Sequence, residues 1–321
     1  MTEPATPAGT SPRSRPGEGS GRAGPSDGVP PGIPSDGVRW SDEVLGPRPT
    51  TLDGARALAY AQATNDANPA YLTGDAVPPV FGVVATWEVL WGLVRVLVAP
   101  GLHDRILHAA HDLHLHRPLR PGQELWTTGR AYGLRRTRSG TRVTAHLRSV
   151  DAGGDAVLEQ YATLFLRRVT GPDDRGEDPP DHALPPGPPG PGAPWRAHLD
   201  ADQTVRYRDA SGDLNPIHTD HEAARAAGLP GIVVHGLCTM ALCGAAVVEL
   251  HADGDPARLA RLAVAFSWPV FPGNDLEVAT RSAGSGTGEV GFTADSAGKT
   301  VIRDGRARLR PPAGPPPAGG A

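Results

Sequence analysis

The sequence predicts an α+β fold made of two similar halves, each with one long buried helix wrapped by an antiparallel β-sheet. Two segments, about 39–169 and 195–310, share several landmarks in the same order. Each segment holds one apolar stretch long enough for a helix, followed by strand-like runs with turn residues between them. A helix that is apolar nearly all round needs a sheet to cover it, and this favours the α+β class.

The repeat is clearest around an Asp-x-Asn-Pro turn. Tyr60–Tyr71 aligns without a gap with Tyr207–His218, at an offset of 147. Further along, Phe81-Gly82 matches His235-Gly236, and the segments 117–122 and 268–273 match at an offset of 151. Landmarks in one order at such similar offsets rarely arise by chance, so the chain is interpreted as a fused duplication.

The expected elements follow the same order in each half. A short helix precedes the Asp-x-Asn-Pro turn, and a long helix follows it, about 82–98 in the first half and 236–250 in the second. The strand-like runs come next, at 111–117, 123–133, 141–151 and 156–168, and then at 259–268, 274–283, 288–295 and 299–309.

Three segments lack the apolar side chains that a packed core needs. Residues 1–38 are expected to form a disordered tail, and 311–321 a second one. Residues 170–194 are rich in Pro and Gly, which favours an extended, semi-rigid linker between the halves.

Composition excludes several classes of function. A formal net charge of −4 gives no case for nucleic acid or an anionic membrane as the partner. The two cysteines, Cys238 and Cys243, lie in an apolar stretch and provide neither a disulfide framework nor a CxxC metal site. No apolar run is long enough to span a membrane, and the N-terminus does not read as a signal peptide, so a cytoplasmic location is expected.

Two motifs carry a family resemblance. Tyr207–His218, followed by His235–Thr239, resembles the hydratase-2 motif of the MaoC-like dehydratases, the family of (R)-specific enoyl-CoA hydratases. Phe266–Gly273 is similar to the strand segment after the helix in that family. The resemblance implies a double hotdog fold with a diverged N-terminal hotdog, a hydro-lyase active on acyl thioesters, and no metal or redox cofactor.

The chemistry of the residues agrees with this resemblance. Hydration of a 2-enoyl thioester needs an activated water, a proton for the α-carbon and stabilisation of charge on the thioester oxygen. Asp213 and His218 flank a tight Asn-Pro turn that can point both at one water, and the carboxylate is expected to keep the imidazole pKa near neutrality. Gly236 is expected at a helix N-terminus, where a free amide favours negative charge. The family resemblance assigns Asp213 and His218 to the water and the Gly236 amide to the carbonyl.

Three further residues are expected to have supporting roles. Asn215 is expected to shape the turn, and Ser211 and His235 are weaker candidates for contact with substrate. The alternative is ordinary turn chemistry, since Asp and Asn cap turns and Pro fixes φ. The downstream match and the duplication favour the catalytic interpretation.

The first copy of the motif is expected to be catalytically silent. It keeps Asp66 and Asn68 but has Tyr71 where His218 stands and Phe81 where His235 stands. A phenol with a pKa near 10 is a poor substitute for imidazole at neutral pH.

The sequence leaves several functions open. The first is reversible hydration of 2-enoyl-CoA, equivalent to dehydration of (R)-3-hydroxyacyl-CoA. A dehydratase acting on chains bound to acyl-carrier protein, a hotdog thioesterase and a non-catalytic acyl-CoA-binding subunit are the alternatives. A homodimer is a further possibility, and neither the acyl chain length nor the pathway can be inferred.

Other signals are discounted. The histidines between His103 and His116, with Asp112, form a possible metal ligand set, but the second half has no counterpart. The glycines at 284, 286 and 288 favour a hairpin turn over a dinucleotide loop. Arg135 and its neighbouring arginines are either a solvated strand edge or a contact for CoA phosphates.

Overall fold

The computed structural model describes residues 37–181, 194–282 and 287–312. Most of the two expected tails, the later part of the expected linker and the turn at 284–286 lie outside the described residues. The fold belongs to the compact unit Ile33–Ala321.

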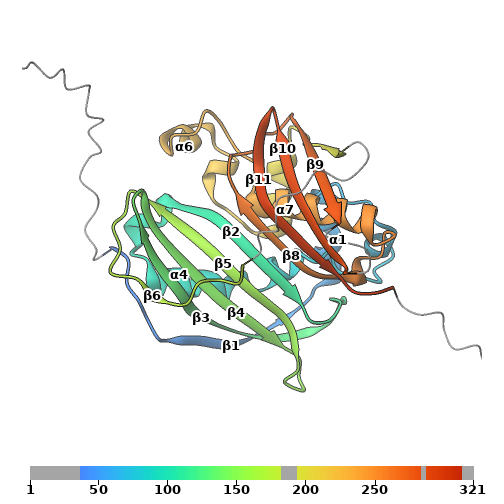
Figure 1. The fold of residues 1–321 in the computed structure, drawn as a ribbon, viewed down its shortest axis with the longest axis horizontal. Coiled ribbons are helices and arrows are strands. Elements are labelled where there is room, and N and C mark those ends of the chain that lie inside the picture. Colours follow the sequence, from blue (N-terminus) through green and yellow to red (C-terminus); the bar gives the residue numbers. More distant parts are fainter. Residues whose placement is uncertain (1–36, 182–193, 283–286, 313–321) are drawn as a thin grey trace, which may run out of the picture. The chain divides into compact units, whose positions relative to one another are not determined.

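One antiparallel sheet joins two sets of strands with the same internal order. The first unit has the order β1-β3-β4-β5-β2, and the second has the equivalent order β7-β9-β10-β11-β8. Strands β2 and β8 pair with each other and join the two units (Figure 1). The strands are β1 (Val44–Thr51), β2 (Ile106–Leu115), β3 (Glu124–Thr137), β4 (Gly140–Val150) and β5 (Ala156–Arg167), then β7 (Trp195–His198), β8 (Leu259–Phe266), β9 (Asp275–Ser282), β10 (Glu289–Ser296) and β11 (Lys299–Leu309).

The helices also recur in the same order, and they lie before the main strands of each unit. The first unit holds α1 (Gly54–Ala63), α2 (Pro69–Leu72), α3 (Phe81–Ala85), α4 (Trp87–Leu97) and the short η2 (Pro100–Arg105). The second unit holds α5 (Gln203–Ser211), η3 (Pro216–His218), α6 (His221–Ala226), α7 (Gly236–His251) and η4 (Pro256–Arg258).

The long helix expected at 82–98 is divided in the structure, whereas its counterpart α7 is continuous. The break falls at Thr86, whose hydroxyl donates to the carbonyl oxygens of Gly82 (3.2 Å) and Val83 (3.0 Å). A threonine that bonds back to the preceding turn competes with the helix and bends it. The same hydroxyl accepts a hydrogen bond from Gln160 on β5 at 2.8 Å, which fixes the bend.

The equivalent helices α1 and α5 meet at the junction of the units. The hydroxyls of Tyr60 and Tyr207 lie 3.2 Å apart. Gln203 on α5 donates to the carbonyl of Ala63 on α1, and Arg56 on α1 donates to the carbonyl of Ala210 on α5. The structure therefore confirms the duplication inferred from the sequence.

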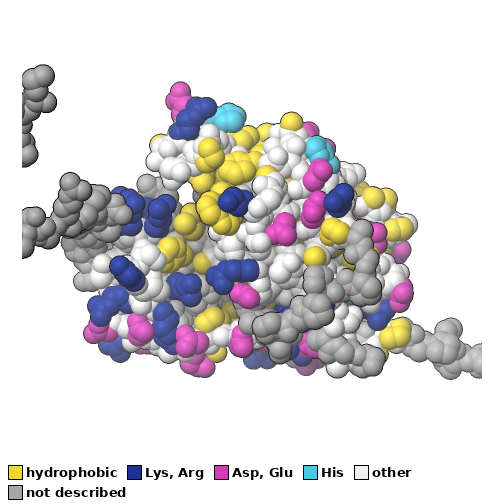
Figure 2. Space-filling view, turned by 45° about the horizontal axis from the view of Figure 1, so that its top comes forward, with side chains coloured by type: hydrophobic (Ala, Val, Ile, Leu, Met, Phe, Trp, Pro, Cys, Tyr) yellow, Lys and Arg dark blue, Asp and Glu magenta, His cyan; other side chains and the backbone are white. Residues whose placement is uncertain are grey.

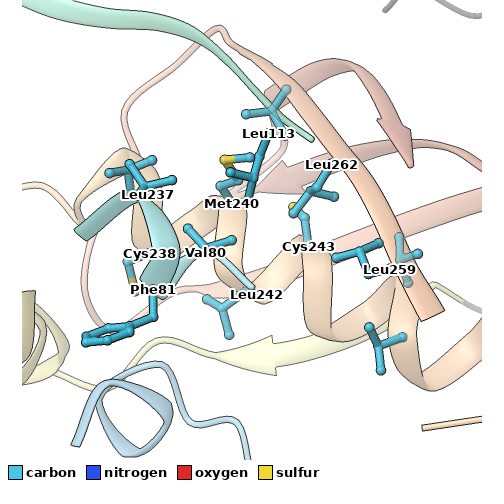
Figure 3. Close-up of a cluster of buried hydrophobic side chains, with 14 of the residues drawn as sticks. Val80, Phe81, Leu113, Leu237, Cys238, Met240, Leu242, Cys243, Leu259 and Leu262 are labelled. Atoms are coloured by element: carbon cyan, nitrogen blue, oxygen red, sulfur yellow. The ribbon is translucent and has the colours of Figure 1, made fainter. Parts of the chain in front are cut away.

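The main core crosses from one unit to the other. Figure 3 shows Val80 and Phe81 of the first unit beside Cys238 and Leu242 of α7. Both cysteines of α7 are buried and free, as expected, and burial raises the pKa of the Cys238 thiol to about 12. They are small core residues and not nucleophiles.

A buried ion pair also links the units, where β2 meets β8. Arg261 on β8 donates two hydrogen bonds to the carboxylate of Asp112 on β2, at 2.9 and 2.6 Å. Asp112 is 2% exposed and Arg261 is 7% exposed. His114 Nε2 lies 3.1 Å from Asp112 as well. A metal ion at Asp112, the alternative considered from the sequence, would have to displace Arg261 from the carboxylate.

We predict that breaking this pair destabilises the fold. Arg261→Met leaves the Asp112 carboxylate buried without its main partner, so the free energy of unfolding should fall by about 3–5 kcal/mol. The double variant Asp112→Leu/Arg261→Met removes both charges and should lie close to the original stability. Urea denaturation followed by circular dichroism measures both. A single variant within about 0.5 kcal/mol of the parent would contradict the prediction.

The start of the expected linker packs on the first unit. The short strand β6 (Arg175–Gly176) pairs with β3, and Tyr132 donates to Glu177 at 3.1 Å. Arg135 donates to Asp178 at 2.8 Å and to nearby carbonyls. Arg135 therefore holds the start of the expected linker against β3.

Figure 2 shows basic and acidic side chains interspersed on one face, with hydrophobic side chains gathered in its upper middle part. In the described parts of the chain, none of the helices is both long and apolar enough to cross a membrane.

Candidate active site

The second Asp-x-Asn-Pro loop begins where α5 ends. Gly212 adopts a left-handed conformation (φ 78°) that lets the chain reverse, and its amide donates to the Arg208 carbonyl at 2.8 Å. Arg56 of the first unit donates to the carbonyl of Ser211 at 2.7 Å. The end of the helix is therefore held by a side chain from the other unit.

The loop is then built by side chains that accept from the backbone two residues on. Ser211 Oγ accepts from the amide of Asp213 at 3.1 Å, and Asp213 Oδ1 accepts from the amide of Asn215 at 3.1 Å. Asn215 Oδ1 accepts from the amide of Ile217 at 3.3 Å and starts η3. These bonds are the ordinary turn interactions that the alternative interpretation expected, and they use one carboxylate oxygen of Asp213.

His218 is held in one orientation by the chain that precedes α7. Its Nδ1 lies 2.7 Å from the carbonyl oxygen of Val233, so Nδ1 carries the proton and donates. The Nε2 atom is then the basic atom of the ring. The imidazole is 8% exposed.

The pKa of His218 departs from the sequence expectation. Burial lowers it below its usual value of 6.5, and the raising effects of Asp213 and of the Val233 carbonyl do not offset burial. Asp213 raises the pKa of His218, as the sequence predicted, but the sequence-based expectation left out burial, which outweighs the carboxylate. At pH 7 the imidazole is neutral, which is the form that can accept a proton.

His235 stacks on His218 with ring centroids 3.7 Å apart. Its Nε2 lies 3.4 Å from the backbone oxygen of Asp213, and its Nδ1 is buried with no hydrogen-bond partner among the described residues. Burial, reinforced by the neighbouring His218, lowers the pKa of His235 to about 2. His235 is therefore a neutral platform that fixes the plane of the His218 ring.

The helix α7 starts at Gly236, directly after His235. The first amides of a helix have no partner within it, and the helix dipole favours negative charge at that end. A Cβ at Gly236 would lie 3.2 Å from the ring of Phe266 on β8. A larger side chain would crowd Phe266 at this position, and Gly236 lies at the helix start, where the sequence predicted it.

The structure brings most of the expected residues together. Ligand atoms of Asp213, His218 and His235 lie within 4.8 Å of one another, and they form the one such group found among the described residues. Gly236 follows His235 in the chain, whereas Ser211 and Asn215 act through the turn. The histidines between His103 and His116 do not form one ligand group within the described part of the chain.

Two contributors had no signal in the sequence. The Val233 carbonyl is a backbone group, so no side-chain pattern indicates it. Arg56 reaches the site from the other unit, and its repeat counterpart is Gln203, so the duplication hides its role.

The first unit contains the same turn without the imidazole. Asp66 Oδ1 accepts from the amide of Asn68 at 3.1 Å, as Asp213 does for Asn215. Tyr71 is 3% exposed, and burial raises its pKa further above 10. This loop offers a carboxylate without a base beside it.

The family comparison agrees with the location of this site. Residues 190–301 match the model of the MaoC-like domain. Peroxisomal multifunctional enzyme type 2 of Drosophila melanogaster is 32% identical over 62% of this chain and 35% of its own length. 3-hydroxyacyl-thioester dehydratase Y of Mycobacterium tuberculosis is 33% identical over 53% of this chain and 60% of its own. The chain thus spans about a third to three fifths of these relatives.

Solved structures share the fold. A MaoC-like dehydratase from Phytophthora capsici superposes with a TM-score of 0.76 at 23% identity, over 88% of this chain and 99% of that one. A Mycobacterium tuberculosis protein with a double hotdog fold gives 0.54 at 18% identity, over 84% and 95%. The expected double hotdog fold is therefore confirmed, and the match to the MaoC-like domain model lies in the second unit.

Proposed function

We propose, from the MaoC-like second half, that this chain reversibly hydrates 2-enoyl-CoA thioesters to (R)-3-hydroxyacyl-CoA at a single site. The observation that carries the proposal is the convergence of the Asp213 carboxylate and the His218 imidazole beside the start of α7. We also propose that the expected segments 39–169 and 195–310 are the two fused hotdog domains.

In the proposed reaction, a water lies between Asp213 and the free Nε2 of His218. The neutral imidazole accepts a proton as the water oxygen bonds to the β-carbon, and Asp213 orients the water and balances the charge on the ring. The Gly236 amide donates to the thioester oxygen as negative charge develops there. The α-carbon then takes up a proton from the same pair, and dehydration is the reverse.

The names of the relatives support this reaction class. The chain resembles a 3-hydroxyacyl-thioester dehydratase at 33% identity and, at the same identity, a probable enoyl-CoA hydratase 2 of Dictyostelium discoideum. The first unit, with Tyr71 in place of a histidine, is proposed to be silent. No metal or redox cofactor enters the proposed steps.

Crotonyl-CoA is the substrate that tests the proposal. Loss of the enoyl-thioester absorbance, with formation of (R)-3-hydroxybutyryl-CoA on a chiral column, is the expected result. Release of free thiol, detected with a thiol-trapping dye, would instead favour a thioesterase. Binding of acyl-CoA without any turnover would favour a non-catalytic subunit, and either result would overturn the proposal.

The carrier of the acyl chain is a finer question. The alternative is a dehydratase that acts on chains bound to acyl-carrier protein. We expect kcat/KM for the crotonyl group to be higher when it is carried by CoA than when it is carried by a carrier protein. We also propose, from the sequence alone, that the protein forms a homodimer and is located in the cytoplasm.

We predict that the acid limb of the pH profile lies below pH 6.5. The neutral form of His218 is required, and burial lowers its pKa, so activity should persist as pH falls through 6.5 and be lost only at lower pH. Measurement of kcat/KM from about pH 5 to pH 9 tests this. An acid limb at or above pH 6.5 would mean that Asp213 raises the pKa of His218 more than burial lowers it.

A further inference from the structure

Strand β8 ends beside the start of α7, the helix that follows the proposed catalytic loop. A Cβ at Gly236, the first residue of α7, would lie 3.2 Å from the ring of Phe266, the last residue of β8. Two turns further along the helix, a Cβ at Gly244 would lie 3.1 Å from Leu262. The helix and the strand therefore run in opposite directions along each other (Figure 1). The chain that continues past β8 passes the N-terminal end of α7.

The segment after β8 stays at this end of the helix. The amide of Ser267 donates to the Val301 carbonyl of β11 at 2.9 Å, so the pairing continues one residue past β8. The Val270 carbonyl accepts from the amide of Val234, which comes two residues before α7, at 2.8 Å. Trp268 lies between these two contacts, and its Cα is therefore within about 7 Å of that of Val270.

The side chains of Trp268 and Lys299 leave the sheet on the side that holds α7. Side chains alternate between the two faces of a strand, and the pairing of Ser267 extends this alternation, so Trp268 shares the face of Phe266. On β11, Lys299 in the same way shares the face of Val301, which is buried in the main core. Both side chains therefore stand beyond the first turn of α7.

The two side chains contact each other at the surface. The Lys299 ammonium lies 5.4 Å from the centroid of the Trp268 ring, within the range of a cation–π interaction. Trp268 is 58% exposed, and it is the one aromatic residue among the strongly exposed hydrophobic side chains of the described ranges. Lys299 is the only lysine in the sequence, and no described carboxylate pairs with it. A large apolar ring is thus left in water beside a cation that has no anionic partner.

An exposed indole beside an ammonium suits a nucleotide. The flat face of an indole stacks on a purine, and an ammonium pairs with phosphate oxygens. Coenzyme A carries an adenosine with a 3′-phosphate and a 5′-diphosphate, and its pantetheine arm separates this nucleotide from the thioester. A thioester at the Gly236 amide would extend its arm away from the end of α7, where Trp268 and Lys299 stand.

We propose that Trp268 and Lys299 form a nucleotide subsite that binds the adenosine phosphates of acyl-CoA and favours CoA over carriers without the nucleotide. This inference rests on the proposed function, because it names the carrier recognised at the same site. The adenine stacks on the indole, and a phosphate oxygen accepts from the ammonium. The phosphopantetheine of a carrier protein lacks the adenine and the 3′-phosphate, so it loses the stacking contact.

The first test compares crotonyl-CoA with crotonyl-pantetheine, which has the same thioester without the nucleotide. The measured quantity is the ratio of kcat/KM for crotonyl-CoA to kcat/KM for crotonyl-pantetheine. Trp268→Ala should reduce this ratio about tenfold, through a higher KM for crotonyl-CoA, because a stacked base is lost. Lys299→Gln should reduce it about threefold, as is typical of an exposed ion pair.

Two further variants separate nucleotide recognition from a general effect on the protein. Trp268→Phe keeps a ring that can stack, so it should restore the ratio to within about threefold of the parent. Leu250→Ala removes a side chain that is 48% exposed at the far end of α7, about 21 Å along the helix from Gly236. This control should keep the ratio of the parent.

The second test observes the subsite without turnover. Because Lys299 is the only lysine, reductive methylation with isotope-labelled formaldehyde labels its side chain and the α-amino group, and methylation keeps the charge. The NMR signal of Lys299 should shift on titration with adenosine 3′,5′-bisphosphate, whereas pantetheine should leave it in place. CoA should produce the shift at a lower concentration than the bisphosphate, because its arm adds contacts at the site. Tighter binding of the free nucleotide than of CoA would contradict the proposal.

The results distinguish a failure of the subsite from a failure of the proposed function. An unchanged ratio in Trp268→Ala and Lys299→Gln, or a Lys299 signal that does not respond to the bisphosphate, would overturn the subsite and leave the hydratase proposal intact. Equal losses on crotonyl-CoA and crotonyl-pantetheine would also overturn it, since the contact would then not be to the nucleotide. A shifted Lys299 signal without turnover of either thioester would overturn the hydratase proposal instead.

Discussion

Asp213→Asn is expected to lower kcat on crotonyl-CoA by about 10²–10⁴-fold while the fold is unchanged. An asparagine oxygen can still accept the hydrogen bond from the Asn215 amide at 3.1 Å, so the turn should persist. What is lost is the negative charge beside His218. Stopped-flow or steady-state absorbance of the enoyl thioester measures the rate, and thermal unfolding by circular dichroism checks the fold.

The first unit supplies a matched control for this variant. Asp66 makes the same turn bond to the Asn68 amide, also at 3.1 Å, but its loop has Tyr71 in place of a histidine. Asp66→Asn should therefore leave kcat within about twofold of the parent, since the turn is kept and no catalytic base is nearby. A loss at Asp66 as large as that at Asp213 would reverse the assignment of the active unit.

The repeat and the apolar patterns predicted most of the sheet. The runs after each long helix correspond to β2–β5 and β8–β11, and the order of those strands is the same in both units. Strands β1 and β7 were missed. Most residues of β1 are exposed and it contains Pro47, so the alternation that indicates a strand is absent.

The division of the first long helix was also missed, for a different reason. The apolar residues on either side of Thr86 continue without a gap, and a single threonine is tolerated in many helices. The bend depends on Gln160, which approaches from β5 and is remote in the sequence. Local pattern therefore predicted the apolar stretch, and a tertiary contact decided its shape.

At the site, residue types were predictable, but their electrostatics were not. The motif predicted that Asp213 and His218 would converge, which the structure confirms. The pKa of His218 depends on how deeply its ring is buried, and this outweighs the raising effects of Asp213 and the Val233 carbonyl. Burial comes from the packing of two units. The spacing of residues along one loop therefore could not predict whether burial or the carboxylate has the larger effect on the pKa.

His218→Gln is expected to lower kcat by about 10²–10⁴-fold and to remove the acid limb of the pH profile. The amide of glutamine can donate to the Val233 carbonyl, as Nδ1 does now at 2.7 Å, but it offers no basic atom to the water. Tyr71→Phe, at the equivalent position of the first unit, is the matched control and should leave both kcat and the limb unchanged.

Combining His218→Gln with Asp213→Asn tests whether the two side chains act on one water. Residues that act as a unit show strongly non-additive losses, so the double variant should fall little below the weaker single variant. Losses that multiply would mean that each group acts on a separate step. In that case one water between Asp213 and His218 would be the wrong arrangement, although both residues would still belong to the site.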